Sequence, residues 1–370
     1  MTKTHFDVRL LDKPAYLQHL ADAIGRTKRG DRVAVASFTF EPEEPPIARL
    51  VSELCAAAQR GVQVSLAVDA YIFLLHGRRK TPGPWWFNMQ AKPPLHGVFR
   101  ERLAAIEVLR NSGVVVGITN QPARRFSTPQ RGRSHIKAAV VNDQVYVGGC
   151  NLSDFRLDLM LQWHDSDTAD WLYPHLCAMA TLERTSEAFD GQDWAQPVQG
   201  GAMLLVDAGL PERSIILDRS LELIDTAQRW IFIASQYFPH GLTGQHLQRA
   251  RQRGVTVYTM HNHPSQHGLA EGSLLHLVLL RERTRLPRSA FAGQLAKQQH
   301  YLHAKVLATE QGAIVGSHNY VPTGTKFGTA EIALQVQEAA FAHDAVTFIA
   351  KLTGLQADPQ LAALLSRPKL

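Results

Sequence analysis

Two stretches of the sequence carry the same polar residues at the same spacing. Ser134-His135-Ile136-Lys137 is followed by Gly148-Gly149-Cys150-Asn151, and Leu302-His303-Ala304-Lys305 is followed by Gly316-Ser317-His318-Asn319. In both stretches the histidine and the asparagine lie 16 residues apart. Imidazoles can attack phosphorus or transfer protons, while ammonium and amide groups can hold phosphate oxygens. We therefore expect two imidazoles, two ammonium groups and two amides around one phosphate.

Each stretch has the pattern of a hairpin. A histidine and a lysine two residues apart on a strand point to the same face, so both can contact one anion. The chain then turns at Asn142-Asp143 in one copy and at Glu310-Gln311-Gly312 in the other, and an apolar strand returns to the asparagine. The glycine before each asparagine permits close approach of the backbone to a ligand. A hairpin of this length predicts that the asparagine returns to the side of the histidine.

The elements before these hairpins are also repeated. Residues 32–40 and 229–238 indicate buried strands that share Ala-Ser and an aromatic end. A helical pattern follows each strand and ends at Gln-Arg-Gly-Val, where Gly61 or Gly254 suits the left-handed residue after a helix. Each half therefore predicts a β-α-β unit. The two helices are expected over about 46–60 and 243–253.

A third match follows the hairpins. Residues 158–165 correspond to residues 331–338, and both indicate strands that open with an acid and lead into a closing helix. Alternating strands and helices predict an α/β fold of two domains, each a mostly parallel sheet flanked by helices, packed with pseudo-twofold symmetry around one active site. Residues 190–201 have linker composition. The expected ranges are 1–195 and 202–370 for the domains and about 168–188 and 340–353 for the closing helices.

The paired motifs and their flanking elements resemble the phospholipase D superfamily, whose members carry two HKD motifs. Within it the sequence is most similar to cardiolipin-synthase-like phosphatidyltransferases without membrane spans. The resemblance implies that one histidine attacks phosphorus to form a phosphohistidine and that the other protonates the leaving alcohol, with His135 as the nucleophile. It implies no cofactor. The implied catalytic residues are His135, Lys137, Asn151, Asp158, His303, Lys305, Asn319 and Glu331.

Several assignments stay open at this stage. By the resemblance, the lysines and asparagines would hold the non-bridging oxygens, and Asp158 and Glu331 would orient the histidines. Asp165 remains an alternative to Asp158, because the spacing between the asparagine and the acid differs between the two halves. Asn142 and Glu310 stand where the HKD motif has aspartate, a position that is mainly structural in the family. Gly149 replaces the usual serine, as in cardiolipin-synthase-like members. Residues expected to contact the substrate are Arg133, Tyr237, His263 and Ser317.

A metal site is an alternative at one place. His261, His263 and His267 have metal-ligand spacing, but no cysteine or acid cluster accompanies them, so we expect no metal.

Basic residues gather before both motifs. Twelve Lys and Arg but only two acids lie between His76 and Lys137, and Arg281, Arg283, Arg285 and Arg288 precede the second motif. With a net charge of +6, this favours an electropositive cleft and an anionic partner. The first half is also about 25 residues longer, because His135 follows Gly61 by 74 residues while His303 follows Gly254 by 49.

The extra residues are expected over about 76–97, around Trp85-Trp86-Phe87. This run either packs in the core or enters a lipid interface beside basic residues. In the lipid case, we expect deletion of about 20 residues here to weaken binding to phosphatidylglycerol vesicles by tenfold or more.

Composition sets the remaining limits. A chain of 370 residues with 45% hydrophobic residues can form two globular domains, and no signal peptide or membrane span is visible. Three widely spaced cysteines favour reduced thiols and a cytoplasmic protein. We also expect peripheral attachment to an anionic membrane surface.

The sequence favours hydrolysis or transfer of phospholipid phosphodiesters. A metal-independent nuclease is the alternative, a non-catalytic phosphate binder is a third class, and the oligomeric state is open.

Overall fold

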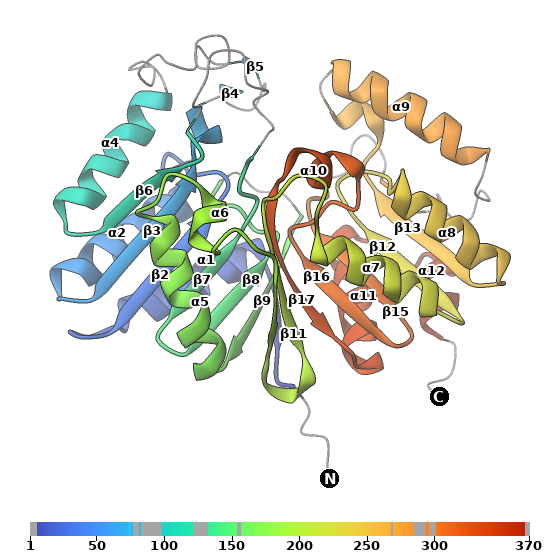
Figure 1. Ribbon diagram of the computed structural model, residues 1–370, viewed down its shortest axis with the longest axis horizontal. Helices are drawn as coiled ribbons and strands as arrows, with labels where there is room; N and C mark the ends of the chain where they lie inside the picture. Colours follow the sequence, from blue (N-terminus) through green and yellow to red (C-terminus); the bar gives the residue numbers. More distant parts are fainter. Residues whose placement is uncertain are drawn as a thin grey trace.

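Two β-sheets lie side by side in the computed structural model, one in each half of the chain (Figure 1). The structure describes residues 6–73, 75–76, 81–82, 98–121, 132–153, 157–267, 269–284, 293–295 and 301–366. The N-terminal sheet has seven strands, in the order β1 (Arg9–Asp12), β9 (Leu159–His164), β8 (Gln144–Gly148), β7 (Ala138–Val141), β2 (Arg32–Ser37), β3 (Gln63–Asp69) and β6 (Val115–Thr119). The C-terminal sheet has eight, in the order β10 (Trp194–Pro197), β11 (Met203–Ala208), β17 (Ala330–Val336), β16 (Gly312–Gly316), β15 (Lys305–Thr309), β12 (Trp230–Ala234), β13 (Thr256–His261) and β14 (Gly293–Gln294).

Helices flank both sheets. Those of the N-terminal half are α1 (Lys13–Gly25), α2 (Pro45–Gln59), α4 (Val98–Asn111), α5 (Ser166–Met179) and α6 (Thr185–Ala188). Those of the C-terminal half are α7 (Ile215–Thr226), α8 (Leu242–Gln252), α9 (Leu269–Arg283), α10 (Pro322–Phe327), α11 (Ala339–Thr353) and α12 (Pro359–Leu365). A separate two-stranded sheet pairs β4 (Leu75–His76) with β5 (Thr81–Pro82).

The central strand order is the same in both halves. β9-β8-β7-β2-β3 corresponds to β17-β16-β15-β12-β13, and the pairs β2–β3 and β12–β13, joined through α2 and α8, are parallel. After each of these helices a glycine has positive φ, 85° at Gly61 and 91° at Gly254. The predicted duplication and the α/β class are confirmed.

The sheets are mixed, however, and the prediction of mostly parallel sheets was wrong. Among the described strands of the N-terminal sheet, β2–β3 and β3–β6 run parallel, while the four other pairs run antiparallel. The turn at Asn142-Asp143 is too short for anything but a reversal of direction, so each motif hairpin adds antiparallel pairs.

Alternate side chains of the central strands enter different cores. Val33 and Val35 of β2 pack in a core with apolar residues of α1 and α2. Ala34 and Ala36 face the other way, into a core that also contains side chains of α5, α11 and the C-terminal strands. Because a strand presents successive residues to opposite faces, each sheet carries its own outer helices while its inner face packs in a core common to both halves.

The first closing helix is shorter than predicted. α5 ends at Met179, and α6 begins only at Thr185, so one helix over 168–188 does not form. The backbone N–H of Asn120 donates to the Glu183 carbonyl at 2.7 Å, and the Thr185 N–H donates to Asn120 Oδ1 at 3.1 Å. These bonds hold the chain out of the helix. In the second half, α11 (Ala339–Thr353) agrees with the prediction.

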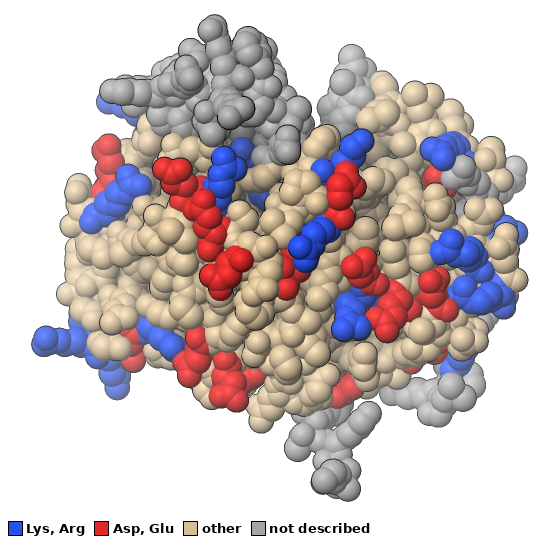
Figure 2. All heavy atoms as spheres, viewed as in Figure 1, with Lys and Arg blue, Asp and Glu red and all other residues tan. Residues whose placement is uncertain are grey.

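Parts of the predicted linker and insertion can also be placed. Residues 194–197 form β10, which pairs with β11, so this part of the predicted linker belongs to the C-terminal sheet. Of the segment 76–97, the structure describes residues 76, 81 and 82, and Trp85-Trp86-Phe87 lies outside the described residues. The basic residues Arg78, Arg79, Lys80, Lys92, Arg124, Arg125, Arg131, Arg285 and Arg288 also lie outside them. On the described face in Figure 2, basic and acidic side chains are interspersed.

Candidate active site

The two halves are joined by backbone hydrogen bonds directly before each motif histidine. The His135 N–H donates to the Ala330 carbonyl at 2.7 Å, and the Ala330 N–H donates to the Arg133 carbonyl at 2.8 Å. At the related place, the His303 N–H donates to the Leu157 carbonyl at 2.7 Å. Ala330 and Leu157 directly precede Glu331 and Asp158. Each histidine is therefore placed beside the acid of the opposite half.

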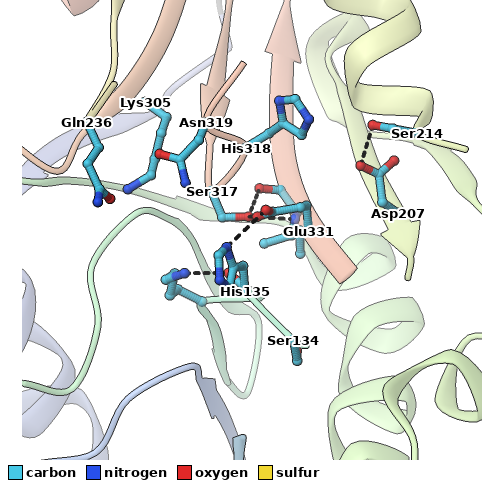
Figure 3. Close-up of polar contacts among 12 residues, drawn as sticks. Ser134, His135, Asp207, Ser214, Gln236, Lys305, Ser317, His318, Asn319 and Glu331 are labelled. Atoms are coloured by element: carbon cyan, nitrogen blue, oxygen red, sulfur yellow. Dashed lines mark hydrogen bonds and ion pairs between the residues drawn. The ribbon is translucent and has the colours of Figure 1, made fainter. Parts of the chain in front are cut away.

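The side chains complete this exchange. His303 Nδ1 lies 2.6 Å from Asp158 Oδ2. His135 Nδ1 lies 3.1 Å from Glu331 Oε1, a contact that Figure 3 shows. A carboxylate on Nδ1 fixes the ring and selects the tautomer with the proton on Nδ1. In the neutral ring Nε2 then carries the lone pair, and in the protonated ring Nε2 carries the second proton. Asp165, the competing acid, instead accepts from the Asp167 and Thr168 backbone at the start of α5.

The two motif lysines are buried beside their histidines. Lys137 Nζ donates to the His135 carbonyl at 2.7 Å, and Lys305 Nζ donates to the His303 carbonyl. Lys305 Nζ also lies 2.9 Å from His303 Nδ1. Burial lowers the pKa of Lys137 to about 8, against the opposing influence of Glu331.

Asn151 is buried and Asn319 is half-buried. Their amide oxygens, Asn151 Oδ1 and Asn319 Oδ1, are both buried and have no hydrogen-bond partner within the described part of the chain. The Ala-Ser repeat explains their positions. Ser37 Oγ accepts from the Leu152 N–H at 3.0 Å, directly after Asn151, and Ser235 Oγ donates to the Asn319 carbonyl at 2.9 Å. In Figure 3 the side chains of Asn319 and Lys305 extend from the C-terminal half toward the side on which His135 lies.

Charge pairing sets the protonation states. Burial alone would raise the pKa of Asp158, but His303 and Lys305 outweigh it and lower the pKa to about 2. Burial is likewise outweighed at Glu331, where His135 and Lys137 hold the pKa below its usual value. Both acids are therefore anionic at neutral pH. Burial lowers the pKa of His135, and the opposing effect of Glu331 does not restore it.

The two acids are held differently. Ser317 Oγ donates to Glu331 Oε2, whereas the related residue in the first half is Gly149, which has no side chain to donate. A Cβ atom at position 149 would lie 2.1 Å from Asp158 Oδ1. The Asp158 carboxylate thus fills the space that a serine would need, and its Oδ1 accepts the Leu159 N–H at 2.9 Å instead.

Two polar residues at strand ends support the motif segments. Asp69, at the end of β3, accepts from the Ser134 N–H at 2.8 Å and from Arg133 Nη1 at 2.9 Å. Asn262, directly after β13, accepts from the Leu302 N–H at 2.8 Å and donates to the Leu302 carbonyl at 2.7 Å. Neither residue was predicted from the sequence, because a polar residue directly after a buried strand is their only sequence signal and is common in proteins.

The residues expected to bind substrate lie in different settings. Arg133 is 7% exposed and forms an ion pair with Asp69. His263 Nδ1 accepts from the Ser265 N–H and caps a short 3₁₀ helix (Pro264–Gln266). Tyr237 stacks on His267 with a centroid separation of 5.1 Å. Ser317 contacts Glu331, as described above.

At the positions where the HKD motif has aspartate, Asn142 and Glu310 accept hydrogen bonds from backbone N–H groups. Asn142 Oδ1 accepts from the Arg32 N–H at 3.1 Å, and Glu310 Oε2 accepts from the Trp230 N–H at 3.1 Å. Arg32 and Trp230 are the first residues of β2 and β12. Both side chains therefore fix the turn of a motif hairpin to the start of the neighbouring strand.

One aromatic residue makes the site unsymmetrical. The Phe38 ring meets the His135 ring edge-on, with centroids 4.3 Å apart, and stacks on Tyr71 at 4.5 Å. Ser37 and Ser235 are equivalent, so the counterpart of Phe38 is Gln236, whose Nε2 donates to the Tyr237 hydroxyl at 2.7 Å. An apolar ring thus adjoins one histidine where the other half has an amide.

His261 is the last residue of β13, and His263 and His267 follow it. Within the residues that the structure covers, no group of three or more His, Cys, Asp or Glu side chains is arranged to hold a metal ion. His261 packs edge-on against Phe238 at 5.0 Å.

No helix in the described ranges combines the length and apolar character needed to cross a bilayer.

Comparison with known structures identifies the fold. Residues 220–352 match the family described as cardiolipin synthase, PLD-like domain. Phosphatidylserine synthase from Haemophilus influenzae Rd KW20 is similar over 94% of this chain and 85% of its own, with a TM-score of 0.64 and 13% sequence identity. The chain has a duplicated phospholipase D-like fold. The predicted resemblance to the phospholipase D superfamily is thereby confirmed.

A second solved structure shares this phospholipase D-like architecture. Polyphosphate kinase from Porphyromonas gingivalis is similar over 94% of this chain and 50% of its own, with a TM-score of 0.58 and 14% identity. A comparison with curated proteins gives no match.

Proposed function

We propose that the chain catalyses hydrolysis or transfer of phospholipid phosphodiesters through a phosphohistidine intermediate. The contact of each histidine with a carboxylate of the opposite half is the observation that carries the proposal. It leaves two oriented Nε2 atoms within one site, which is what a two-step displacement at phosphorus requires.

In the first step, His135 Nε2 attacks phosphorus and the bond from phosphorus to the leaving alcohol breaks. His303 gives that alcohol its proton. In the second step, His303 takes a proton from water or an acceptor alcohol, whose oxygen attacks phosphorus and breaks the phosphorus–nitrogen bond. Lys137, Lys305 and the two asparagines hold the non-bridging oxygens, on which negative charge increases in the transition state.

The assignment of roles follows from the charges. A nucleophilic imidazole must be neutral, and burial lowers the pKa of His135, so that it carries no proton on Nε2 at neutral pH. His303 lies 2.6 Å from the anionic Asp158, which stabilises a positive charge on its ring. His303 is therefore suited to act as the general acid.

Two comparisons support a lipid substrate. The matching family is described as a cardiolipin synthase domain, and phosphatidylserine synthase shares the fold over most of both chains. We propose a cytoplasmic enzyme that attaches peripherally to anionic membranes.

The two-histidine mechanism can be tested by His135→Ala and His303→Ala. Each change removes one of two obligatory groups, so we expect turnover of a chromogenic phosphodiester to fall at least 1000-fold, on the order seen for essential catalytic groups. Thermal unfolding should be nearly unchanged. The control is His164→Ala, because the His164 side chain is 57% exposed and its partner, Asp143, lies in the turn of the first hairpin and is not one of the proposed catalytic residues. Activity within tenfold of the unmodified protein in either motif variant would contradict the mechanism.

The substrate class needs separate assays. Phosphatidylglycerol vesicles and labelled single-stranded DNA should be offered in parallel, and we expect cleavage or transfer with the lipid only. Efficient cleavage of the DNA instead would support the nuclease alternative. EDTA should leave the rate unchanged, and loss restored by zinc would move the chemistry to His261 and His263.

A further inference from the structure

Helix α9 exposes a row of leucines. Leu274 and Leu277 are 64% and 63% exposed, and Leu280 is 49% exposed. Residues three apart on a helix are surface neighbours, so these three side chains form one stripe, which we call the leucine stripe. Isolated exposed leucines are common on proteins, but three on one helix face form a patch that indicates an interaction site.

The opposite face anchors α9 to the domain. Leu279 is 4% exposed and belongs to the outer core of the C-terminal half, together with Leu247 of α8 and Phe238. Glu282 is also buried, at 2% exposure. The helix is therefore held by its inner face, and the leucine stripe is not needed to attach it.

Charge at the end of the stripe identifies the partner. Arg281 is exposed and continues the outward face beyond Leu277 and Leu280. Its neighbour Glu282 is buried. At the upper right of Figure 2, where α9 lies in Figure 1, uncharged surface adjoins basic atoms and a smaller acidic patch. Exposed leucines beside an arginine match a bilayer with anionic head groups, because the leucines enter the interface while the cation meets the phosphates.

The position of α9 connects it to the active site. The helix begins a few residues after Asn262, whose side chain binds the Leu302 backbone directly before His303. In Figure 1, α9 lies at the end of the molecule where β4, β5 and α10 also lie. α10 follows the motif residue Asn319 by only a few residues. A surface in contact with α9 would thus lie near the segments that carry the motif residues.

We propose that the leucine stripe and Arg281 of α9 dock on a surface of anionic phospholipid. The inference rests on the proposed function, since it explains how a lipid phosphodiester reaches the site. The docking element is distinct from the segment 76–97 considered in the sequence analysis.

The test compares two triple variants. Leu274→Gln/Leu277→Gln/Leu280→Gln removes the stripe, and glutamine keeps the helix propensity. Val108→Gln/Val115→Gln/Leu182→Gln removes three apolar side chains of 40–54% exposure in the N-terminal half. Co-sedimentation with phosphatidylglycerol vesicles and with phosphatidylcholine vesicles measures binding, and a soluble chromogenic diester measures the intact site. We expect the stripe variant to bind phosphatidylglycerol at least tenfold more weakly, the control variant within twofold of the unmodified protein, and both to keep diester turnover.

The outcomes separate the two proposals. If the unmodified protein cleaves no diester but the stripe variant still loses vesicle binding, docking holds and the proposed function fails. Equal vesicle binding by the stripe variant and the control variant would overturn docking, as would no vesicle binding by the unmodified protein. Sedimentation velocity adds one further case. If the unmodified protein is a dimer, the stripe variant is a monomer and both bind vesicles equally, the leucine stripe contacts a second copy of the chain. That result would overturn the inference.

Discussion

Gly149 and Ser317 occupy related positions, yet they leave different amounts of room for the acid beside them. Glu331 extends past Ser317 and accepts from its hydroxyl, while Asp158, one methylene shorter, lies against the bare backbone of Gly149. The two combinations are glycine with aspartate and serine with glutamate. Each places a carboxylate on the Nδ1 atom of a histidine, so the glycine in the first motif is matched to its own acid.

This matching predicts unequal results for two exchanges. In Gly149→Ser, the new Cβ would lie 2.1 Å from Asp158 Oδ1, so the carboxylate must move away from His303. We expect turnover to fall about 100-fold, the loss typical of a misplaced catalytic group. Ser317→Gly removes one hydrogen bond to a charged group, worth about 2 kcal/mol, and should cost roughly 10- to 30-fold. Steady-state kinetics on a soluble diester would measure both, and full activity of Gly149→Ser would contradict the matching.

The pH profile should distinguish the two acids. As nucleophile, His135 works when neutral, so the rate should rise with pH through a midpoint below the usual value of about 6.5. It should fall again near pH 8, where Lys137 loses its proton. Glu331 raises the pKa of His135, so Glu331→Gln should move the acid midpoint to lower pH. Asp158→Asn should lower the rate and leave that midpoint in place, because Asp158 contacts His303.

Profiles of kcat/KM for both variants would check this. An acid midpoint that moves in Asp158→Asn and stays in Glu331→Gln would reverse the roles of the two histidines. A covalent phosphate trapped on His303 would lead to the same reversal.

At the scale of elements, the ends of β3 and β13 hold the motif segments. Asp69 and Asn262 accept the backbone N–H groups of Ser134 and Leu302, each directly before a motif histidine. Parallel neighbours of β2 and β12 end at the same edge of their sheets, so a polar residue at that edge can reach the incoming segment. The strand ends therefore position the histidines through backbone bonds.

We expect Asp69→Ala to lower the free energy of unfolding by about 3 kcal/mol, because it leaves the Arg133 guanidinium buried without its counter-ion. Asp170→Ala is the control. Its carboxylate is 64% exposed in an ion pair with Arg32, so its loss should change the free energy of unfolding by less than about 0.5 kcal/mol. Urea denaturation of both variants would test this, and equal stability would show that the buried pair contributes little.

The elements also show how far the sequence alone reaches. The β-α-β units could be predicted because apolar runs and a glycine after each helix are local signals, as at Gly61 and Gly254. The direction of the strands was predicted wrongly, because the alternation of strands and helices was given more weight than the two short hairpins, which add antiparallel pairs. The exchange of Asp158 and Glu331 between the halves depends on how two inner sheet faces pack, which leaves no mark in local sequence. Asp69 was missed because a single acid after a strand is common in any protein.

The whole molecule is bound together by more than its linker. Both halves contribute to one core, and backbone bonds cross between them at Ala330 and Leu157. Both histidines also contact an acid from the other half. The halves therefore form a single structural unit.

We expect the chain to tolerate a cut between Asp190 and Gly191, two exposed residues with positive φ in a turn. Fragments 1–190 and 191–370, produced together, should co-elute in size-exclusion chromatography and cleave a soluble diester. Each fragment alone should be inactive, because His135 then lacks Glu331 and His303 lacks Asp158. Activity of a lone fragment would show that the crossed contacts are dispensable.

The contrast between Phe38 and Gln236 has a consequence for the direction in which a substrate enters. Between two identical half-sites, a diester with two different alcohols could bind either way round, and either alcohol could leave. Here an aromatic edge adjoins His135 and an amide lies on the other side, so the two orientations are no longer equivalent in energy. If the site acts on diesters as proposed, this difference fixes its polarity, and the same ester bond should be presented for cleavage at every turnover.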